Sequence, residues 1–120
     1  MYFTYTITEV PDTVVSDIGV RTEIDENNAL RFIYLSFNNC NIVLLTQENS
    51  EVTLVDESEQ LIAKGILKLA SGKRNLYVEI EPEYQVTNSG NYTLIISEGL
   101  LKFSSTVYDK ELRITIPFNT

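Results

Sequence analysis

The side chains that most often carry out catalysis are scarce in this sequence of 120 residues. It contains no histidine, which excludes Ser-His-Asp and Cys-His catalysis and removes the commonest transition-metal ligand. Cys40 is the single cysteine, and we interpret it as a small buried or turn residue because no base accompanies it. There is also no Gly-x-Ser-x-Gly elbow, P-loop or dinucleotide-binding fingerprint. The common enzyme classes therefore find no support.

Carboxylate pairs are the remaining candidates for acid–base chemistry. Glu79 and Glu81 alternate along one expected strand, and Glu83 follows Pro82. Glycoside hydrolysis needs two carboxyl groups across a cleft, one of them with a pKa raised by burial. Two neighbours on the outward face of one strand do not provide that geometry, so we interpret them as solvated side chains. We predict a protein that is not an enzyme, with no catalytic residue and no cofactor.

Oxygen-bearing side chains crowd one short segment, which contains Glu23, Asp25, Glu26, Asn27 and Asn28. Carboxylate and amide oxygens are the ligands that Ca²⁺ prefers. The spacing lacks the central glycine and the final bidentate glutamate of an EF-hand loop. We expect a turn here without a metal ion, and a calcium-binding loop is the alternative.

Lys64, Lys68, Lys73 and Arg74 form the main basic cluster of an acidic chain, whose formal net charge is −8. One interpretation is a site that binds an acidic protein partner. The other is a solvated hairpin and strand edge, where lysine discourages edge-to-edge pairing. Nucleic acid is not expected as a partner, because contacts to phosphates need an excess of basic side chains.

Runs with the two-residue period of β-strands must position these side chains. Leu76, Val78 and Ile80 alternate with more polar residues, and later Tyr92 begins a second alternating run. Turn residues recur every 8–12 residues or so, which is typical of a sandwich or barrel. We predict strands at 2–9, 14–22 (a kinked edge segment), 29–37, 42–46, 52–56, 61–69, 76–81, 92–97, 100–106 and 112–116, the last closed by Pro117.

Two of these segments carry further expectations. Segment 29–37 is apolar on both faces, so we expect it to be central or covered on both sides. Segment 61–69 could form two helical turns. The β-rich surroundings favour a strand instead, with Leu61, Ala63, Leu67 and Leu69 inward and a bulge at Gly65.

The segment Asn88-Ser89-Gly90-Asn91-Tyr92 resembles the E–F corner of immunoglobulin-like sandwiches. There, a tyrosine near the start of strand F sends its hydroxyl back to the backbone a few residues upstream. Leu94 stands where many members have a cysteine, and tryptophan is absent. The resemblance implies one disulfide-free, antiparallel immunoglobulin-like β-sandwich over residues 1–120, with about seven to nine strands. The alternative is a generic β-turn, in which Gly90 supplies a positive φ.

Such a domain implies a structural or binding module that acts by protein–protein contact. The chain is similar, in architecture only, to immunoglobulin-like virion modules of tailed bacteriophages. This implies an auxiliary capsid or head-decoration protein, present in multiple copies, that contacts the major capsid protein or other virion proteins. The start shows no secretion signal and no run is long enough to span a membrane, so we expect synthesis in the host cytoplasm, location in the virion and no membrane partner.

Two alternatives remain at the level of function. One is a module of the phage tail or baseplate. The other is an extracellular adhesin or carbohydrate-binding domain excised from a larger protein. In that case Tyr2, Tyr77, Tyr84 and Tyr108 could form a platform on which sugars stack.

Overall fold

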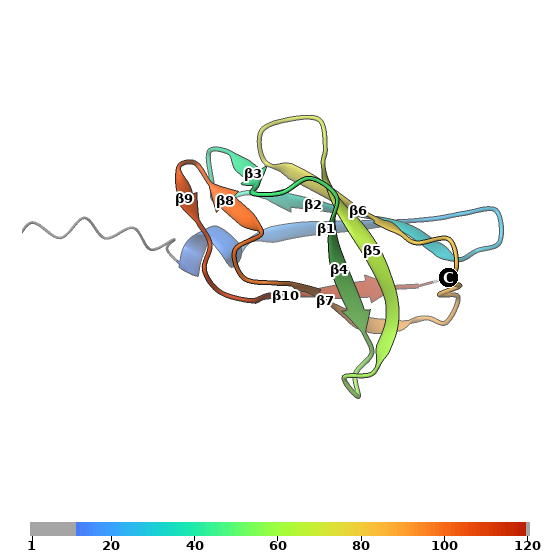
Figure 1. Ribbon diagram of the computed structural model, residues 1–120. Coiled ribbons are helices and arrows are strands. Elements are labelled where there is room, and N and C mark those ends of the chain that lie inside the picture. Colours follow the sequence, from blue (N-terminus) through green and yellow to red (C-terminus); the bar gives the residue numbers. More distant parts are fainter. Residues whose placement is uncertain (1–11, 120) are drawn as a thin grey trace, which may run out of the picture.

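The computed structural model describes residues 12–119, and the strand predicted at 2–9 lies outside them. Within this range the chain forms ten β-strands and one short 3-10 helix (Figure 1). All strand pairs are antiparallel, so the predicted all-β class is confirmed, in a form consistent with a sandwich or a barrel. The elements are η1 (Asp12–Val15), β1 (Ile18–Ile24), β2 (Leu30–Phe37), β3 (Val43–Leu45), β4 (Ser50–Val55), β5 (Leu61–Leu69), β6 (Asn75–Ile80), β7 (Gly90–Ile96), β8 (Leu101–Phe103), β9 (Thr106–Val107) and β10 (Leu112–Phe118).

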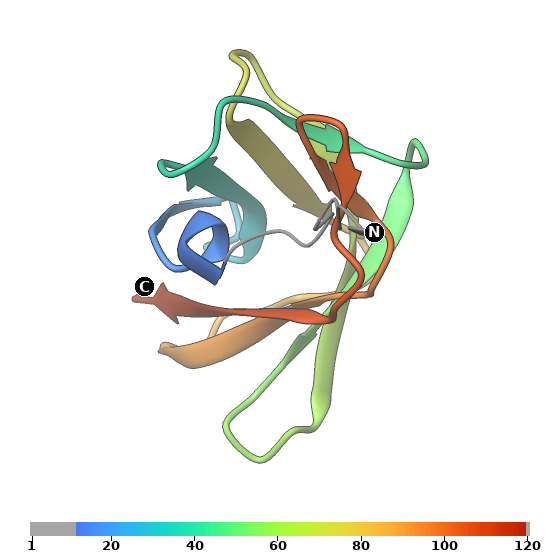
Figure 2. The same cartoon turned by 90° about the vertical axis from the view of Figure 1, so that its left-hand side faces the viewer.

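The strands form two sheets of unequal size. The larger has seven strands in the order β1-β2-β6-β5-β4-β7-β10, and the smaller has three in the order β3-β8-β9. Figure 2 shows the large sheet curled around an interior, with the small sheet beside it. The two edge strands of the large sheet, β1 and β10, approach each other to within 8 Å between some Cα atoms. The large sheet is therefore curved almost to closure.

The core lies inside this curved sheet, because each strand turns alternate side chains inward. On β6 the inward residues are Leu76, Val78 and Ile80, all at most 1% exposed. The alternating run that begins at Tyr92 on β7 behaves in the same way. Removing these aliphatic side chains from water is the main contribution to stability. The two-residue period predicted for both segments is confirmed.

Strand β5 matches the predicted segment 61–69, and the helical alternative is wrong. The predicted bulge at Gly65 is also wrong, because Gly65 pairs in register with both neighbouring strands. A Cβ atom at Gly65 would lie only 2.5 Å from Cγ1 of Val78. The glycine therefore leaves room for the Val78 side chain of the neighbouring strand, and it does not mark an extra residue. Leu61 and Leu69, predicted to face inward, are each 51% exposed at the strand ends.

Three of the other differences from the predicted segments change how an element is divided or where it ends. Segment 14–22 divides between η1 and β1, which are separate elements. Segment 100–106 is a hairpin of β8 and β9 rather than one strand, because Ser104 adopts a positive φ of 56° and turns the chain. Strand β10 continues past Pro117 to Phe118. Proline is tolerated there because β10 is an edge strand of the sheet.

Strand β2 occupies an interior position between β1 and β6, as its apolar faces predict. Ile33, Leu35 and Phe37 point inward and are fully buried. Phe32 and Tyr34 point to the other side of the sheet and remain partly accessible. These outward aromatic side chains form part of the candidate site.

Candidate interaction surface

The solvent side of strands β1, β2, β6 and β5, called the outer face below, carries two cross-strand rows of side chains. The strand register fixes each row, since residues paired across strands lie on the same face. The two rows are the Phe32 row, made of Glu23, Phe32, Glu79 and Ile66, and the Tyr34 row, made of Arg21, Tyr34, Tyr77 and Lys68.

Three aromatic rings form the centre of the outer face. The ring centroids of Phe32, Tyr34 and Tyr77 are 6.1–6.2 Å apart, and the ring planes are tilted by 31–59°. This spacing is within the range in which aromatic pairs attract each other. All three side chains are half-buried, so part of each remains accessible to solvent.

Charged side chains of both signs surround this aromatic centre. The Arg21 guanidinium lies over the Tyr34 ring at 4.2 Å from its centroid, and it approaches Glu23 at 3.8 Å. At the other side of the cluster, Lys68 lies 3.6 Å from Glu79. Exposed pairs of this kind add little to stability. An aromatic centre with a charged rim is, however, the usual anatomy of a protein–protein interface.

Two titratable groups on or near this face are perturbed. Partial burial, with the negative charge of Glu23, raises the pKa of Tyr34 above its ordinary value. Burial first, and then the neighbouring carboxylates of Glu51 and Glu83, raise the pKa of Glu81. Glu79 forms an ion pair with Lys68, so Glu79 and Glu81 have different electrostatic surroundings, as the two carboxylates of an acid–base pair would. They do not face each other across a cleft, however, because they follow one another on the same strand end.

The four predicted partner-binding cations occupy two different settings. Lys64 and Lys68 extend from the outer side of β5, and Lys64 approaches Glu51 at 3.6 Å. Lys73 and Arg74 lie in the exposed loop between β5 and β6, where they line a shallow pocket with Cys40. Their backbone carbonyls accept hydrogen bonds from the β2 end and from β3. Only Lys68 belongs to the rows of the outer face.

The tyrosines predicted as a sugar platform do not share one surface. Tyr77 is on the outer face, whereas Tyr108 is 6% exposed and packs edge-to-face against Phe103. Tyr84 is half-buried against the core, and Tyr2 lies outside the described residues. The partners of Tyr77 are instead two residues of β2. The sequence signal for these two β2 residues is the presence of apolar side chains on both faces of segment 29–37, a pattern that by itself predicts only burial.

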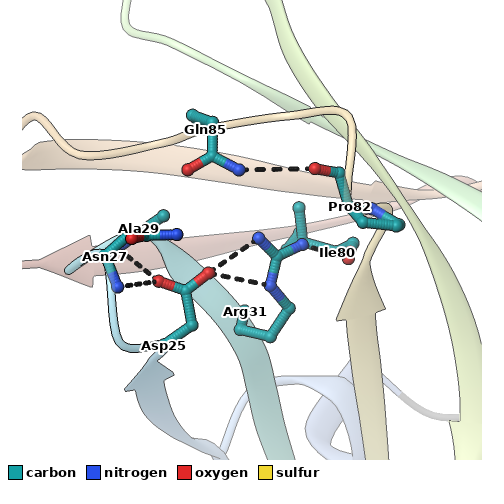
Figure 3. Close-up of polar contacts among 7 residues, drawn as sticks. All are labelled: Asp25, Asn27, Ala29, Arg31, Ile80, Pro82 and Gln85. Atoms are coloured by element: carbon teal, nitrogen blue, oxygen red, sulfur yellow. Dashed lines mark hydrogen bonds and ion pairs between the residues drawn. The ribbon is translucent and has the colours of Figure 1, made fainter.

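The turn between β1 and β2 is organised by Asp25 (Figure 3). One carboxylate oxygen, Oδ1, accepts hydrogen bonds from the backbone amides of Asn27 and Ala29 at 2.8 and 3.1 Å. The other oxygen, Oδ2, accepts two from Arg31, at 3.2 Å from Nε and 2.8 Å from Nη2. Arg31 also donates to the carbonyl of Ile80, which ties the turn to the end of β6. The Arg31 guanidinium holds the pKa of Asp25 below its ordinary value.

These contacts bear on the calcium alternative. Both oxygens of Asp25 face donors, and a cation would have to displace Arg31 to reach them. Glu23 belongs to the outer face and approaches Arg21. In the part of the chain that the structure describes, no three His, Cys, Asp or Glu side chains are grouped so as to hold a metal ion.

The predicted corner residues lie at the start of β7. The Tyr92 hydroxyl donates a hydrogen bond of 2.6 Å to the backbone carbonyl of Asn88, four residues upstream. The Tyr92 ring is 7% exposed and packs near Phe118 of β10. Gly90 is exposed, and a Cβ atom there would meet only ordinary contacts with the Tyr92 ring. The generic-turn alternative, in which Gly90 supplies a positive φ, is wrong because Gly90 does not adopt one.

Cys40 is half-buried in the turn after β2, and its thiol donates to the carbonyl of Phe37 at 3.5 Å. Burial raises the pKa of this thiol, although the positive charge of Arg74 opposes the shift. The thiol is therefore protonated at neutral pH and is a weak nucleophile there. This agrees with its interpretation as a turn residue.

Comparisons of the chain with protein-family models, curated proteins and solved structures give no match. Between residues 12 and 119, no helix is long and apolar enough to cross a membrane.

Proposed function

We propose that this chain is a non-enzymatic, immunoglobulin-like structural or binding module that acts by protein–protein contact. The observation that carries the proposal is the cluster of Phe32, Tyr34 and Tyr77 on the solvent side of a sheet. Aromatic and arginine side chains are enriched at the centres of interfaces, where they contribute most of the binding energy. A sheet face that needed only solvation would carry polar residues at these positions.

The strand order supports the immunoglobulin-like assignment. In such domains strands A, B, E and D pair in one half, and C, F and G pair in the other. Lettering β1, β2, β4, β5, β6, β7 and β10 in chain order as A to G gives the observed order A-B-E-D followed by C-F-G. The hydrogen bond from Tyr92, at the start of strand F, is the second support. The chain departs from the separate sheets of the family in the pairing of β4 with β5, which joins the two halves.

At a finer level, we assign the module to the virion of a tailed bacteriophage, as an auxiliary capsid protein. The support is the architectural resemblance to such modules. A small module gains affinity there by binding in many copies, since avidity compensates for small single contacts. Contacts would be made to the major capsid protein or to other virion proteins.

Co-sedimentation with intact particles from the same source tests this assignment. The purified chain should pellet with particles at a saturable ratio. Phe32→Glu should reduce binding, and Thr115→Glu on the outer side of β10 is the matched control that should leave it unchanged. Separate runs with heads and with tails distinguish a capsid position from one in the tail or baseplate. If the wild-type chain stays in the supernatant with every fraction, the virion assignment is wrong.

A further inference from the structure

We infer that two copies of this chain bind each other through the outer face, about a two-fold axis that runs across the strands between the Phe32 row and the Tyr34 row. The inference rests on the proposed function, in that it takes the outer face to be a binding surface. It adds one partner for this surface, a second copy of the chain, which would occupy the outer face in place of a virion protein.

The geometry of face-to-face packing limits the possible axes. Two identical surfaces can meet face to face only about a two-fold axis that lies in the plane between them. An axis across the strands brings each strand opposite its own copy and exchanges the two rows. The Phe32 row then faces the Tyr34 row of the second copy. The sheets would pack about 10 Å apart, with strands within about 30° of antiparallel.

This arrangement matches charge with opposite charge. Arg21 and Glu23 both lie on β1, one in each row. Exchange of the rows places Arg21 opposite Glu23 of the second copy, and symmetry repeats the contact at the other side of the axis. The Arg21 and Glu23 side chains are 68% and 49% exposed, so they are accessible to a second molecule. Complementary charges of this kind fix the register of an interface.

The aromatic centre is matched by the same operation. Phe32 comes to lie opposite Tyr34 of the second copy, and the reverse contact follows by symmetry. Tyr77 comes to lie opposite Glu79, whose carboxylate can accept a hydrogen bond from the phenol. The rings would be shielded from water at the centre of the interface, where they stabilise a complex most.

An axis along the strands gives a poorer match. It would place β1 opposite β5 of the second copy, so Arg21 would face Lys68 twice. Like charges that meet at an interface oppose association. Of the two axes, the one across the strands pairs Arg21 with Glu23, and it leaves Lys68 opposite the apolar Ile66 rather than opposite a like charge.

The size of the face predicts a weak dimer. Four strands spaced by about 4.8 Å, each about 25 Å long, cover at most about 480 Å² per copy, or about 960 Å² in total, because the outer face of the curved sheet is convex (Figure 2). This is at the lower limit for specific interfaces. We therefore expect association at tens to hundreds of micromolar, on the order of weak transient complexes.

Other occupants fit the face less well. A sugar ring stacks on an open aromatic face, but the Tyr34 ring is covered by Arg21 and the three rings are not coplanar. A strongly charged partner would need a rim of one sign, whereas Arg21 and Glu23 alternate here. The proposed axis exchanges the positions of Arg21 and Glu23, so a second copy of the chain complements both charges.

Sedimentation equilibrium of charge-reversed variants tests the inference. In R21E the new carboxylate faces Glu23 of the second copy at both symmetric contacts, and in E23R the new guanidinium faces Arg21. Each variant alone should therefore associate at least about tenfold more weakly than the wild-type chain. An equimolar mixture of the two variants should associate as heterodimers, since each contact then pairs opposite charges. The double variant R21E/E23R should also recover self-association.

The controls keep the test independent of folding and of the virion assignment. Both positions are exposed, so thermal unfolding and circular dichroism should show that all variants fold. Thr115→Glu, on the outer side of β10 and outside both rows, should associate like wild type. A wild-type chain that is monomeric up to about 1 mM overturns the inference, and so does a mixture no stronger than its separate components. A monomer that still binds particles through Phe32 would overturn only the inference, whereas a dimer that ignores particles would overturn only the virion assignment.

Discussion

The hydrogen bond from Tyr92 to Asn88 offers a sharp test of the fold, because one atom can be removed without changing the core. Tyr92→Phe deletes the hydroxyl that donates to the Asn88 carbonyl at 2.6 Å. The ring remains, so its packing near Phe118 is retained. The substitution therefore isolates the constraint that joins the start of β7 to the connection before it.

The expected loss is about 1 kcal/mol. A hydrogen bond contributes roughly 0.5–1.5 kcal/mol net, and a buried group left without a partner costs about 1–3 kcal/mol. Asn88 is exposed, so water can replace the lost donor and the larger penalty does not apply. For a domain of this size, 1 kcal/mol corresponds to a decrease in melting temperature of roughly 3–5 °C.

Urea unfolding followed by circular dichroism at low micromolar concentration measures this loss. Tyr77→Phe is the matched control, because it removes a hydroxyl from a half-buried ring on the outer face. We expect that control to change the free energy of unfolding by less than about 0.5 kcal/mol. A loss below about 0.3 kcal/mol for Tyr92→Phe would refute the argument that the corner hydrogen bond stabilises the fold.

The same residue predicts an alkaline limit to stability. Burial, and then the negative charge of Asp56, raise the pKa of Tyr92 above its ordinary value of 10.0. The neutral phenol is therefore favoured in the folded state. Its contribution is complete below pH 10 and is lost as the pH rises through the higher folded-state pKa. Unfolding measured between pH 9 and about 11.5 should show a steeper decline for wild type than for Tyr92→Phe, and parallel curves would contradict this account.

Three further predictions follow from individual contacts. Gly65→Ala should destabilise the fold by about 1–3 kcal/mol, since the added Cβ would overlap a side chain of the next strand. The control Gly90→Ala should change the free energy of unfolding by less than about 0.5 kcal/mol. Equal losses for the two variants in urea unfolding would contradict this prediction. Arg31→Met should lower the melting temperature. Because Arg31 holds the pKa of Asp25 low, the stability of the wild-type chain should fall as the pH drops below the ordinary value of 3.8. If Arg31→Met loses stability in acid as steeply as wild type, the ion pair does not cause this pH dependence. Cys40 should react with iodoacetamide at pH 7 much more slowly in the folded chain than in urea, and equal rates would mean that its thiol is not shielded.

Local periodicity predicted most strands correctly, for a physical reason. The alternation of apolar and polar residues indicates which side chains are buried, and along β6 and β7 this can be read from each residue in turn. The incorrect predictions concern positions where a contact between residues distant in the sequence determines the local structure. Gly65 looked like a bulge because glycine permits one, but the close approach of Val78 from another strand explains it. No local pattern contains that information.

The candidate site was less predictable, because cross-strand register creates it. Phe32 and Tyr34 are close in sequence, whereas Tyr77 joins them only through the pairing of β2 with β6. The placement of Arg21 and Glu23 in different rows likewise depends on the register of β1 with β2. The tyrosines grouped from sequence were grouped by type alone, and the fold buries Tyr108 in the core.

The most direct test of the central claim, that this chain acts by contact through its outer face, is amide chemical-shift mapping by nuclear magnetic resonance. Spectra of the uniformly ¹⁵N-labelled chain would be compared between about 20 µM and about 1 mM, the range expected for an interface of this size. The account predicts concentration-dependent shifts on β1, β2, β6 and β5, centred on Phe32, Tyr34 and Tyr77. Shifts confined to β4, β7 and β10, or spectra that do not change, would contradict it.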